Sequence, residues 1–182
     1  MRSLVVYESF FGNTGRLAES IAAGLRSADD QAALVQSVRG APPSLDGVDL
    51  LIVGAPTHFL TLSSPLSRWL QAQYWGDPSG PHRSHRPYGR PAAPVALRDW
   101  LRRLPPRPLP PTAVFDTRMR GRGVGGAGPA IADCLRNRGH QLVRPPAAFY
   151  VQGIGGPLAP GESERAVDWG RSVARAARAG QS

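Results

Sequence analysis

The sequence contains no lysine, so its 22 basic residues other than histidine are all arginine. It contains a single cysteine, Cys134, which excludes a disulfide framework and a cysteine-rich metal site. Its apolar runs are short, as at residues 113–115, whereas a membrane-spanning helix needs about 20 consecutive apolar residues. The amino terminus shows no charged segment followed by an apolar one, the pattern of a secretion signal. We therefore expect a soluble, cytoplasmic protein with no membrane partner.

The 182 residues have the length of a single domain, and 41% of them are hydrophobic, enough to build a core. Charged residues make up 19% of the chain, which excludes wholesale disorder. There are 21 glycines and 19 prolines, an excess that predicts extensive loops.

The positive charge is concentrated in the middle of the chain. Residues 68–144 contain 14 arginines against four acidic residues, whereas residues 1–67 contain four arginines against six. Such a field attracts phosphates, nucleic acid or acidic partners. The alternative is a compositional preference in which arginine provides the solubility that lysine usually shares. Because the arginines are scattered and not interleaved with stacking aromatics, we do not expect nucleic acid as a partner.

Strand patterns alternate with helix patterns along the chain. Apolar runs predict strands at 3–7, 32–38, 48–53 and 112–115, and a fifth strand from 141–143 and 147–151 that is broken by two prolines. Apolar residues at three- to four-residue spacing predict helices at 14–25, 64–70, 96–104, 129–138 and 162–179. Alternation of this kind predicts an α/β fold, with a parallel sheet covered by helices on both faces.

A loop of small and hydroxyl residues, 8–14, joins the first strand to the first helix. Backbone N–H groups at a helix N-terminus and two hydroxyls can bind a phosphate group. No lysine is present, and the glycine-rich loop ending in Gly-Lys-Ser/Thr that binds triphosphates is absent, so a phosphomonoester suits this loop better. A tight turn with a capping threonine is the alternative interpretation.

The stretch VVYESFFGNTGRLAESIAAGL (5–25) resembles the opening of the flavodoxin-like family, and VDLLIVGAPTH (48–58) resembles that family's third strand and following loop. The resemblance covers about 1–70 and 92–179, which leaves 71–91 as an insertion rich in Pro, Arg and His within a single domain, 1–182. It implies a doubly wound sheet of five parallel strands in the order 2-1-3-4-5. It also implies flavin mononucleotide (FMN) at the carboxyl ends of the strands.

The resemblance also assigns roles to residues around the FMN. The residues expected to wrap the phosphate are Ser9, Phe10, Phe11, Gly12, Asn13 and Thr14, with Ser9 and Thr14 contributing hydroxyls. The residues expected to line one side of the isoalloxazine ring are Pro56, Thr57, His58 and Phe59. The second flavin loop would contain Asp116, Thr117, Arg118 and the glycines after them. This loop often carries a stacking Tyr or Trp in the family, but residues 116–121 contain no aromatic. Three alternatives follow for this loop. An arginine plane could stack on the ring, its positive charge could favour the anionic reduced flavin, or the site could be weak and degenerate.

The insertion contains His82 and His85, which suggest either a metal pair or a solvated loop, and we favour the loop because no acidic or cysteine ligand accompanies them. Its aromatic residues, Tyr74, Trp75 and Tyr88, would serve a lid over the site or a homodimer contact. No Ser-His-Asp or paired-carboxylate arrangement can be argued, so catalytic residues stay unassigned.

Three functions follow from these observations. The first is an FMN-binding protein of electron transfer, whose redox partner would be an acidic protein or a small-molecule acceptor, since the chain is basic. The second is an FMN-dependent NAD(P)H:quinone-type reductase, which an open ring face would favour. The third is a flavin-free binding or regulatory domain with an arginine-rich partner surface.

Overall fold

The computed structural model describes residues 1–28, 33–38, 45–57, 96–104, 110–121, 125–153 and 155–180, and these contain five strands and four helices. The strands are β1 (Ser3–Tyr7), β2 (Ala33–Ser37), β3 (Leu50–Pro56), β4 (Thr112–Met119) and β5 (Ala147–Val151). The helices are α1 (Asn13–Ala28), α3 (Leu97–Arg102), α4 (Ala127–Asn137) and α5 (Glu162–Ala179).

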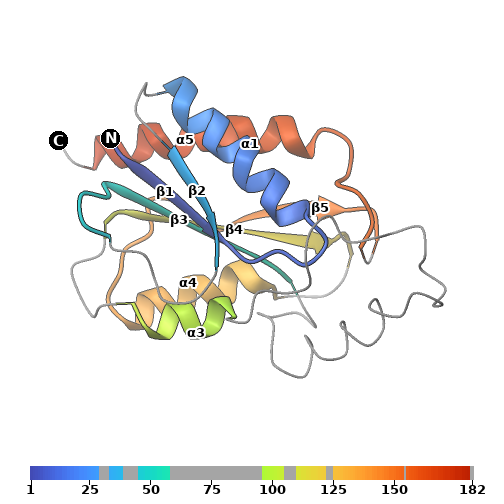
Figure 1. Ribbon diagram of the computed structural model, residues 1–182, viewed down its shortest axis with the longest axis horizontal. Coiled ribbons are helices and arrows are strands. Elements are labelled where there is room, and N and C mark those ends of the chain that lie inside the picture. Colours follow the sequence, from blue (N-terminus) through green and yellow to red (C-terminus); the bar gives the residue numbers. More distant parts are fainter. Residues whose placement is uncertain are drawn as a thin grey trace.

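The strands form one parallel sheet in the order β2-β1-β3-β4-β5. Helices α1 and α5 cover one face and α3 and α4 the other, as Figure 1 shows. This arrangement confirms the predicted α/β class, the strand order and the helices on both faces. In such a sheet the carboxyl ends of the strands meet at one edge, where ligands bind.

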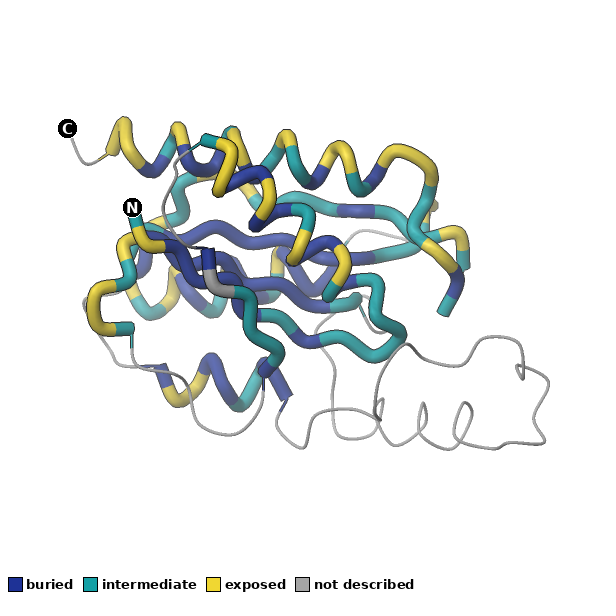
Figure 2. Tube along the Cα trace, turned by 45° about the horizontal axis from the view of Figure 1, so that its top comes forward, coloured by how far each residue is buried: buried dark blue, intermediate teal, exposed yellow. Residues whose placement is uncertain are grey.

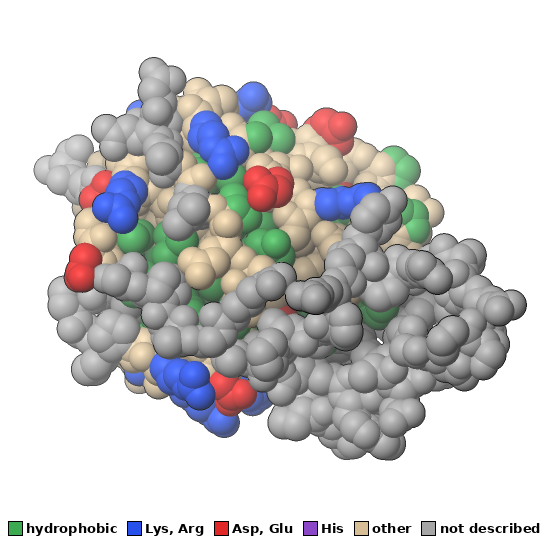
Figure 3. Space-filling model, viewed as in Figure 1, with side chains coloured by type: hydrophobic (Ala, Val, Ile, Leu, Met, Phe, Trp, Pro, Cys, Tyr) green, Lys and Arg blue, Asp and Glu red, His purple; other side chains and the backbone are tan. Residues whose placement is uncertain are grey.

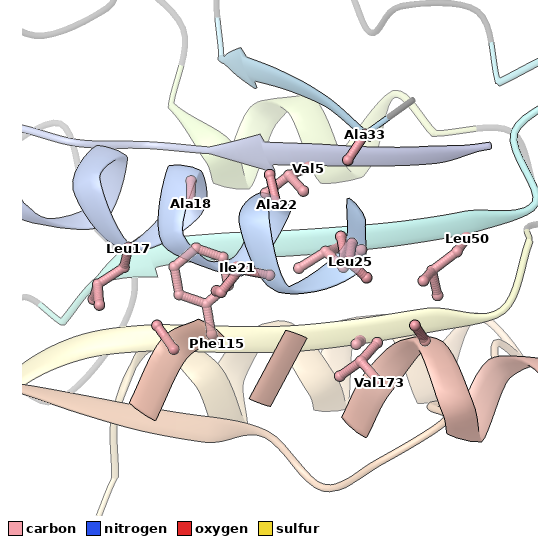
Figure 4. Close-up of a cluster of buried hydrophobic side chains, with 14 of the residues drawn as sticks. Val5, Leu17, Ala18, Ile21, Ala22, Leu25, Ala33, Leu50, Phe115 and Val173 are labelled. Carbon is pink, nitrogen blue, oxygen red and sulfur yellow. The ribbon is translucent and has the colours of Figure 1, made fainter. Parts of the chain in front are cut away.

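Two apolar clusters, one on each face of the sheet, form the core. The cluster under α1 and α5 contains fully buried side chains from both helices and the sheet, including Leu17, Ile21, Phe115 and Val173 (Figure 4). The cluster under α3 and α4 contains Trp100, which is almost completely buried, together with Leu51, Val53, Ile131 and Leu135. Burial follows the sheet through the middle of the molecule, while the outer sides of the helices are exposed (Figure 2).

Helices α1 and α5 approach each other closely because glycine lies at each contact. A Cβ on Gly24 would lie 2.0 Å from the carbonyl oxygen of Val167, and one on Gly170 would lie 2.3 Å from that of Ile21. Both distances are shorter than any real Cβ contact, so each position requires glycine. The close packing fixes α1, and therefore its N-terminus, against the rest of the fold.

The fourth strand is longer than the sequence predicted. Asp116, Thr117 and Arg118, expected in a loop, lie within β4, where they pair with Ala148, Phe149 and Tyr150 of β5 in register. The apolar pattern ends at residue 115, but the polar side chains that follow find partners inside the protein, so the strand continues. The prediction that these three residues belong to a loop was wrong.

The boundaries of two other strands also differ from those that the sequence predicted. Strand β3 continues through residues 54–56, beyond its predicted end at residue 53. Residues 141–143 do not belong to the fifth strand, and Leu142 forms only an isolated bridge to Thr112. The predicted helix 64–70 and the insertion 71–91, with its histidines and aromatics, lie outside the described residues. Among the helices that are described, none has the length and apolarity to cross a membrane.

Candidate functional site

The carboxyl ends of β1, β3 and β4 bring the predicted site segments together. The N–H of Glu8, just after β1, donates to the carbonyl of Gly54 in β3 at 3.0 Å. The N–H of Thr57, just after β3, donates to the carbonyl of Thr117 in β4 at 2.8 Å. The structure therefore places these parts of the predicted site side by side, whereas His58 and Phe59 lie outside the described residues.

The loop between β1 and α1, residues 8–12, together with the first turn of α1, is called the phosphate loop below. Gly12 has a φ of 86°, a left-handed conformation that glycine adopts without strain, and its N–H donates to Ser9 Oγ at 3.1 Å. Phe10 and Phe11 are half-buried within the loop. The turn therefore leads the chain directly into the first turn of α1.

The first turn of α1 has N–H groups without an acceptor inside the helix. The first intrahelical bond runs from the N–H of Arg16 to the carbonyl of Gly12, at 3.0 Å. The N–H groups of Asn13, Thr14 and Gly15 precede this bond, so they have no helical carbonyl to bind. They also lie at the positive end of the helix dipole. This set of donors has the chemistry of an anion site.

Two side chains of the phosphate loop connect it to its surroundings. Asn13 Nδ2 donates to the carbonyl of Gly156 at 2.6 Å, which ties α1 to the connection between β5 and α5. The hydroxyl oxygens of Thr14 and Thr117 lie 3.0 Å apart, and both residues are buried. When Thr117 is the donor, the Thr14 hydroxyl keeps its own hydrogen for another acceptor.

The polar residues at the end of β4 form a compact group that we call the Asp116 cluster: Asp116, Arg118, Thr57 and the backbone N–H groups of Ala127 and Gly128. The Asp116 carboxylate is completely buried. Its Oδ2 accepts from the N–H of Gly128 at 2.7 Å, from Thr57 Oγ1 at 3.3 Å and from Arg118 Nη2. Its Oδ1 accepts from Arg118 Nε at 2.8 Å. Thr57 Oγ1 in turn accepts from the N–H of Ala127 at 2.9 Å.

Arg118 uses each of its three side-chain nitrogens inside the protein. Two bind Asp116, and Nη1 donates to the carbonyl of Gly125 at 2.7 Å. The hydrogen bond to Asp116 raises the pKa of Arg118 above its ordinary value, although burial acts in the opposite direction. The guanidinium therefore stays charged across the ordinary pH range.

Comparison with known proteins bears on this arrangement. No protein-family model matches the chain, and no curated protein matches it in sequence. Among solved structures, a flavodoxin from the domain Archaea superposes with a TM-score of 0.62 at 18% identity, covering 98% of this chain and 99% of that one. Flavodoxin 2 from Bacillus cereus superposes with a TM-score of 0.61 at 22% identity, covering 99% of both chains. A mutant flavodoxin from Pseudomonas aeruginosa superposes with a TM-score of 0.61 at 17% identity, covering 98% of this chain and 99% of that one.

The chain has the flavodoxin-like fold. The structural likeness spans the length of both chains, and the strand order agrees with it. At these identities the likeness establishes the fold, while the chemistry of the site has to be argued from this chain's own residues.

An aromatic residue of β5 lies beside the end of β4, although residues 116–121 themselves contain no aromatic. Tyr150 of β5 pairs in register with Arg118, and the guanidinium of Arg120 lies 4.7 Å from the centre of its ring. The missing information was the register of β5 against β4, because neither residue is near the other in sequence. Tyr150 therefore flanks the end of β4 on the side away from β3.

Glu8 is a second residue whose role was missed. Its side chain is buried, and its Oε2 accepts from the N–H of Leu97, the first residue of α3, at 3.3 Å. An acidic residue directly after an apolar strand was the available signal. The contact joins the phosphate loop to the segment that follows the insertion.

Many of the described arginines bind backbone carbonyls or nearby acids. Arg138 donates to the carbonyls of Leu101 and Leu104 at the C-terminal end of α3, at 2.8 and 2.6 Å. Its positive charge there interacts favourably with the negative end of the helix dipole. Arg165 donates to the carbonyl of Ala148 at 2.5 Å. In the view of Figure 3 the described arginines lie in separate places, with acidic side chains between them. These contacts favour a structural use of arginine over a single basic patch.

Among the described residues no group of His, Cys, Asp and Glu is arranged to bind a metal.

Proposed function

We propose that the chain binds FMN at the carboxyl edge of the sheet and takes part in electron transfer. The observation that carries the proposal is the open N-terminus of α1, where three backbone N–H groups follow a glycine turn. A phosphomonoester is the ligand group that this set fits best.

The donors suit the phosphate of FMN in kind and number. Backbone N–H groups of Asn13, Thr14 and Gly15 would hold its oxygens, and the Thr14 hydroxyl would donate a further hydrogen bond while it accepts one from Thr117. No lysine is available in the chain to neutralise a triphosphate. When bound, the flavin supplies the redox chemistry, and the protein supplies binding and electrostatic tuning.

The isoalloxazine ring would lie beyond the phosphate, between the segment after β3 and the segment after β4. Pro56, Thr57, His58 and Phe59 are the proposed lining on one side. On the other side the proposed lining is the segment after Arg118, whose charge is balanced by Asp116. The electron-transfer partner proposed for this basic chain is an acidic protein or a small-molecule acceptor.

The experiment is a titration of the purified protein with FMN, followed by quenching of flavin fluorescence. Thr14→Val removes one hydrogen bond to a charged group, worth roughly 1.5–3 kcal/mol, and should weaken FMN binding about 10- to 100-fold. The matched control is Thr112→Val, which removes a buried hydroxyl bonded to the carbonyl of Pro110 near the opposite end of β4. It should leave FMN affinity unchanged. Absence of binding at high micromolar FMN would overturn both redox functions and leave the flavin-free domain.

A reductase that passes electrons from a nicotinamide cofactor to a quinone is the second candidate. Residues 116–121 carry no aromatic side chain that would cover the outer ring face, and an open face favours access by a second substrate. Steady-state oxidation of NADH or NADPH with a soluble quinone separates the two. Turnover supports the reductase, and its absence in an FMN-loaded protein supports the carrier.

A further inference from the structure

Asp116 makes contacts with three separate segments of the chain. It accepts from Thr57 at the end of β3, from the N–H of Gly128 in the first turn of α4, and from Arg118 two residues further along β4. Arg118 then reaches the carbonyl of Gly125. One buried carboxylate therefore fixes both flanks of the connection between β4 and α4, whose described residues 120, 121, 125 and 126 we call the ring loop.

We propose that Asp116 is a positioning residue that holds the ring loop for the isoalloxazine ring, independently of the phosphate loop. This inference rests on the proposed function, because it assigns a role in the same FMN site. None of the contacts of Asp116 involves residues 8–15, so the two halves of the site are held by different groups.

The hydrogen-bond inventory excludes a direct role for Asp116 as a donor to the flavin. An ionised carboxylate only accepts, and this one already accepts four hydrogen bonds inside the protein. Its partner Arg118 has each nitrogen engaged as well. Asp116 must therefore act through the positions of the groups that it binds.

The backbone around the cluster is shaped to admit this carboxylate. Gly126 has a φ of 151°, and a Cβ there would lie 2.4 Å from Arg118 Nη2 and 2.7 Å from Asp116 Oδ2. A Cβ on Gly128 would lie 3.0 Å from the same oxygen. Small residues at the start of α4 thus let the helix N-terminus come within hydrogen-bond distance of Asp116, which an alanine at residue 126 would prevent.

The test compares Asp116→Asn with Glu162→Gln. Glu162 is the matched control because it is also a buried carboxylate that pairs with an arginine, Arg165, and accepts a backbone N–H, that of Tyr150 at 2.9 Å. Each variant is titrated with FMN, with riboflavin, which lacks the phosphate, and with inorganic phosphate, at a temperature where circular dichroism shows it folded.

Asp116→Asn is expected to lower the affinities for FMN and riboflavin by the same factor, at least about tenfold, because a charged hydrogen-bond acceptor of the ring loop is lost. Its affinity for phosphate should equal that of the wild type. Thr14→Val should show the reverse pattern, with FMN weakened and riboflavin unchanged. Glu162→Gln should leave the binding of all three compounds unchanged. A merely structural role for Asp116 would lower stability as Glu162→Gln does without changing the flavin affinities of the folded protein.

A milder variant covers the case in which Asp116→Asn does not fold. Thr57→Val removes one donor to Asp116 and the acceptor of the Ala127 N–H. It should weaken both flavins equally, by a few fold. Unchanged flavin affinity in either folded variant would overturn the positioning role while FMN binding by the wild type stands. Failure of the wild type to bind FMN would overturn the proposed function itself, and the positioning role with it.

Discussion

Helices α1 and α4 both begin at the carboxyl edge of the sheet, but their N-termini differ in what binds them. The first two N–H groups of α4 are taken by Thr57 and Asp116 from neighbouring strands. The N–H groups that open α1 precede the first helical bond and have no helical acceptor. Among the described residues, the N-terminus of α1 therefore offers backbone donors that the N-terminus of α4 has already used.

The difference arises from the residues at the ends of the strands. β1 is followed by Glu8, whose carboxylate Oε2 accepts from the N–H of Leu97 at the start of α3. Near the end of β4, Asp116 and Arg118 form an ion pair, and Asp116 also accepts an N–H in the first turn of α4. The same edge of the sheet thus holds an open half, the phosphate loop, and a closed half, the ring loop.

The largest expected effect is that of Arg118→Met, which leaves the Asp116 carboxylate buried without its cation. Breaking a buried ion pair in this way costs about 3–5 kcal/mol, to be measured as the free energy of unfolding in urea. Arg102→Met is the control, since the pair with Asp99 is exposed on both sides and contributes about 1 kcal/mol or less. Equal losses in the two variants would contradict a closed ring loop.

The same variant has a pH signature. Because the pKa of Arg118 is raised in the folded protein, the stability that its charge contributes is complete below the ordinary arginine pKa and is lost only above it. The stability difference between wild type and Arg118→Met should therefore not shrink from about pH 6 to pH 9, because arginine stays charged there and the unpaired, buried carboxylate of the variant only becomes more costly as it ionises. A difference that shrinks across this window would show that another titrating group controls the cluster.

Gly126→Ala is expected to have the next largest effect, about 2–3 kcal/mol, because the new Cβ overlaps Arg118 and Asp116 in an already unfavourable backbone conformation. Gly121→Ala is the matched control in the same loop. Gly121 has a φ of 74° but nothing within 4 Å of a Cβ, so only the backbone strain, about 1 kcal/mol, is expected. Thermal unfolding of the two variants separates crowding from strain, and equal losses would contradict the crowding argument.

Thr117→Val should lower the free energy of unfolding by about 1–3 kcal/mol, because it leaves the buried Thr14 hydroxyl without its partner. It should also weaken FMN less than Thr14→Val does, since Thr117 only orients the group that would contact phosphate. Paired unfolding and FMN titrations measure both effects. A larger loss of FMN affinity in Thr117→Val than in Thr14→Val would reverse the assigned roles.

Arg120→Ala should have the smallest effect. Arg120 is exposed and stacks on Tyr150, a contact worth about 0.5–1 kcal/mol at such a site. A loss in unfolding free energy of several kcal/mol would mean that this stacking, and not Asp116, holds the ring loop.

The sequence predicted the backbone structure of the connection from β1 to α1 better than that of the end of β4. The short connection from β1 to α1 is built from local signals, a glycine turn and a helix pattern, and these lie within a few residues of one another. The ring loop depends on contacts that are distant in sequence, such as Thr57 with Ala127 and Arg118 with Tyr150. The end of β4 was placed too early because Asp116 and Arg118 are polar, and only the three-dimensional structure shows that they satisfy each other.

The most direct test of the difference between the two halves is a set of backbone amide NMR spectra recorded while inorganic phosphate, and then FMN, is added. Phosphate should shift the amide signals of Asn13, Thr14 and Gly15 and leave those of Ala127 and Gly128 unchanged, since the latter are already bound to side chains. When FMN is then added, the shifts of the phosphate-loop signals should reach saturation near one equivalent of FMN. The amide signals of the ring loop should shift as well. Phosphate-induced shifts at Ala127 and Gly128, or no shift at residues 13–15 with either ligand, would contradict the account.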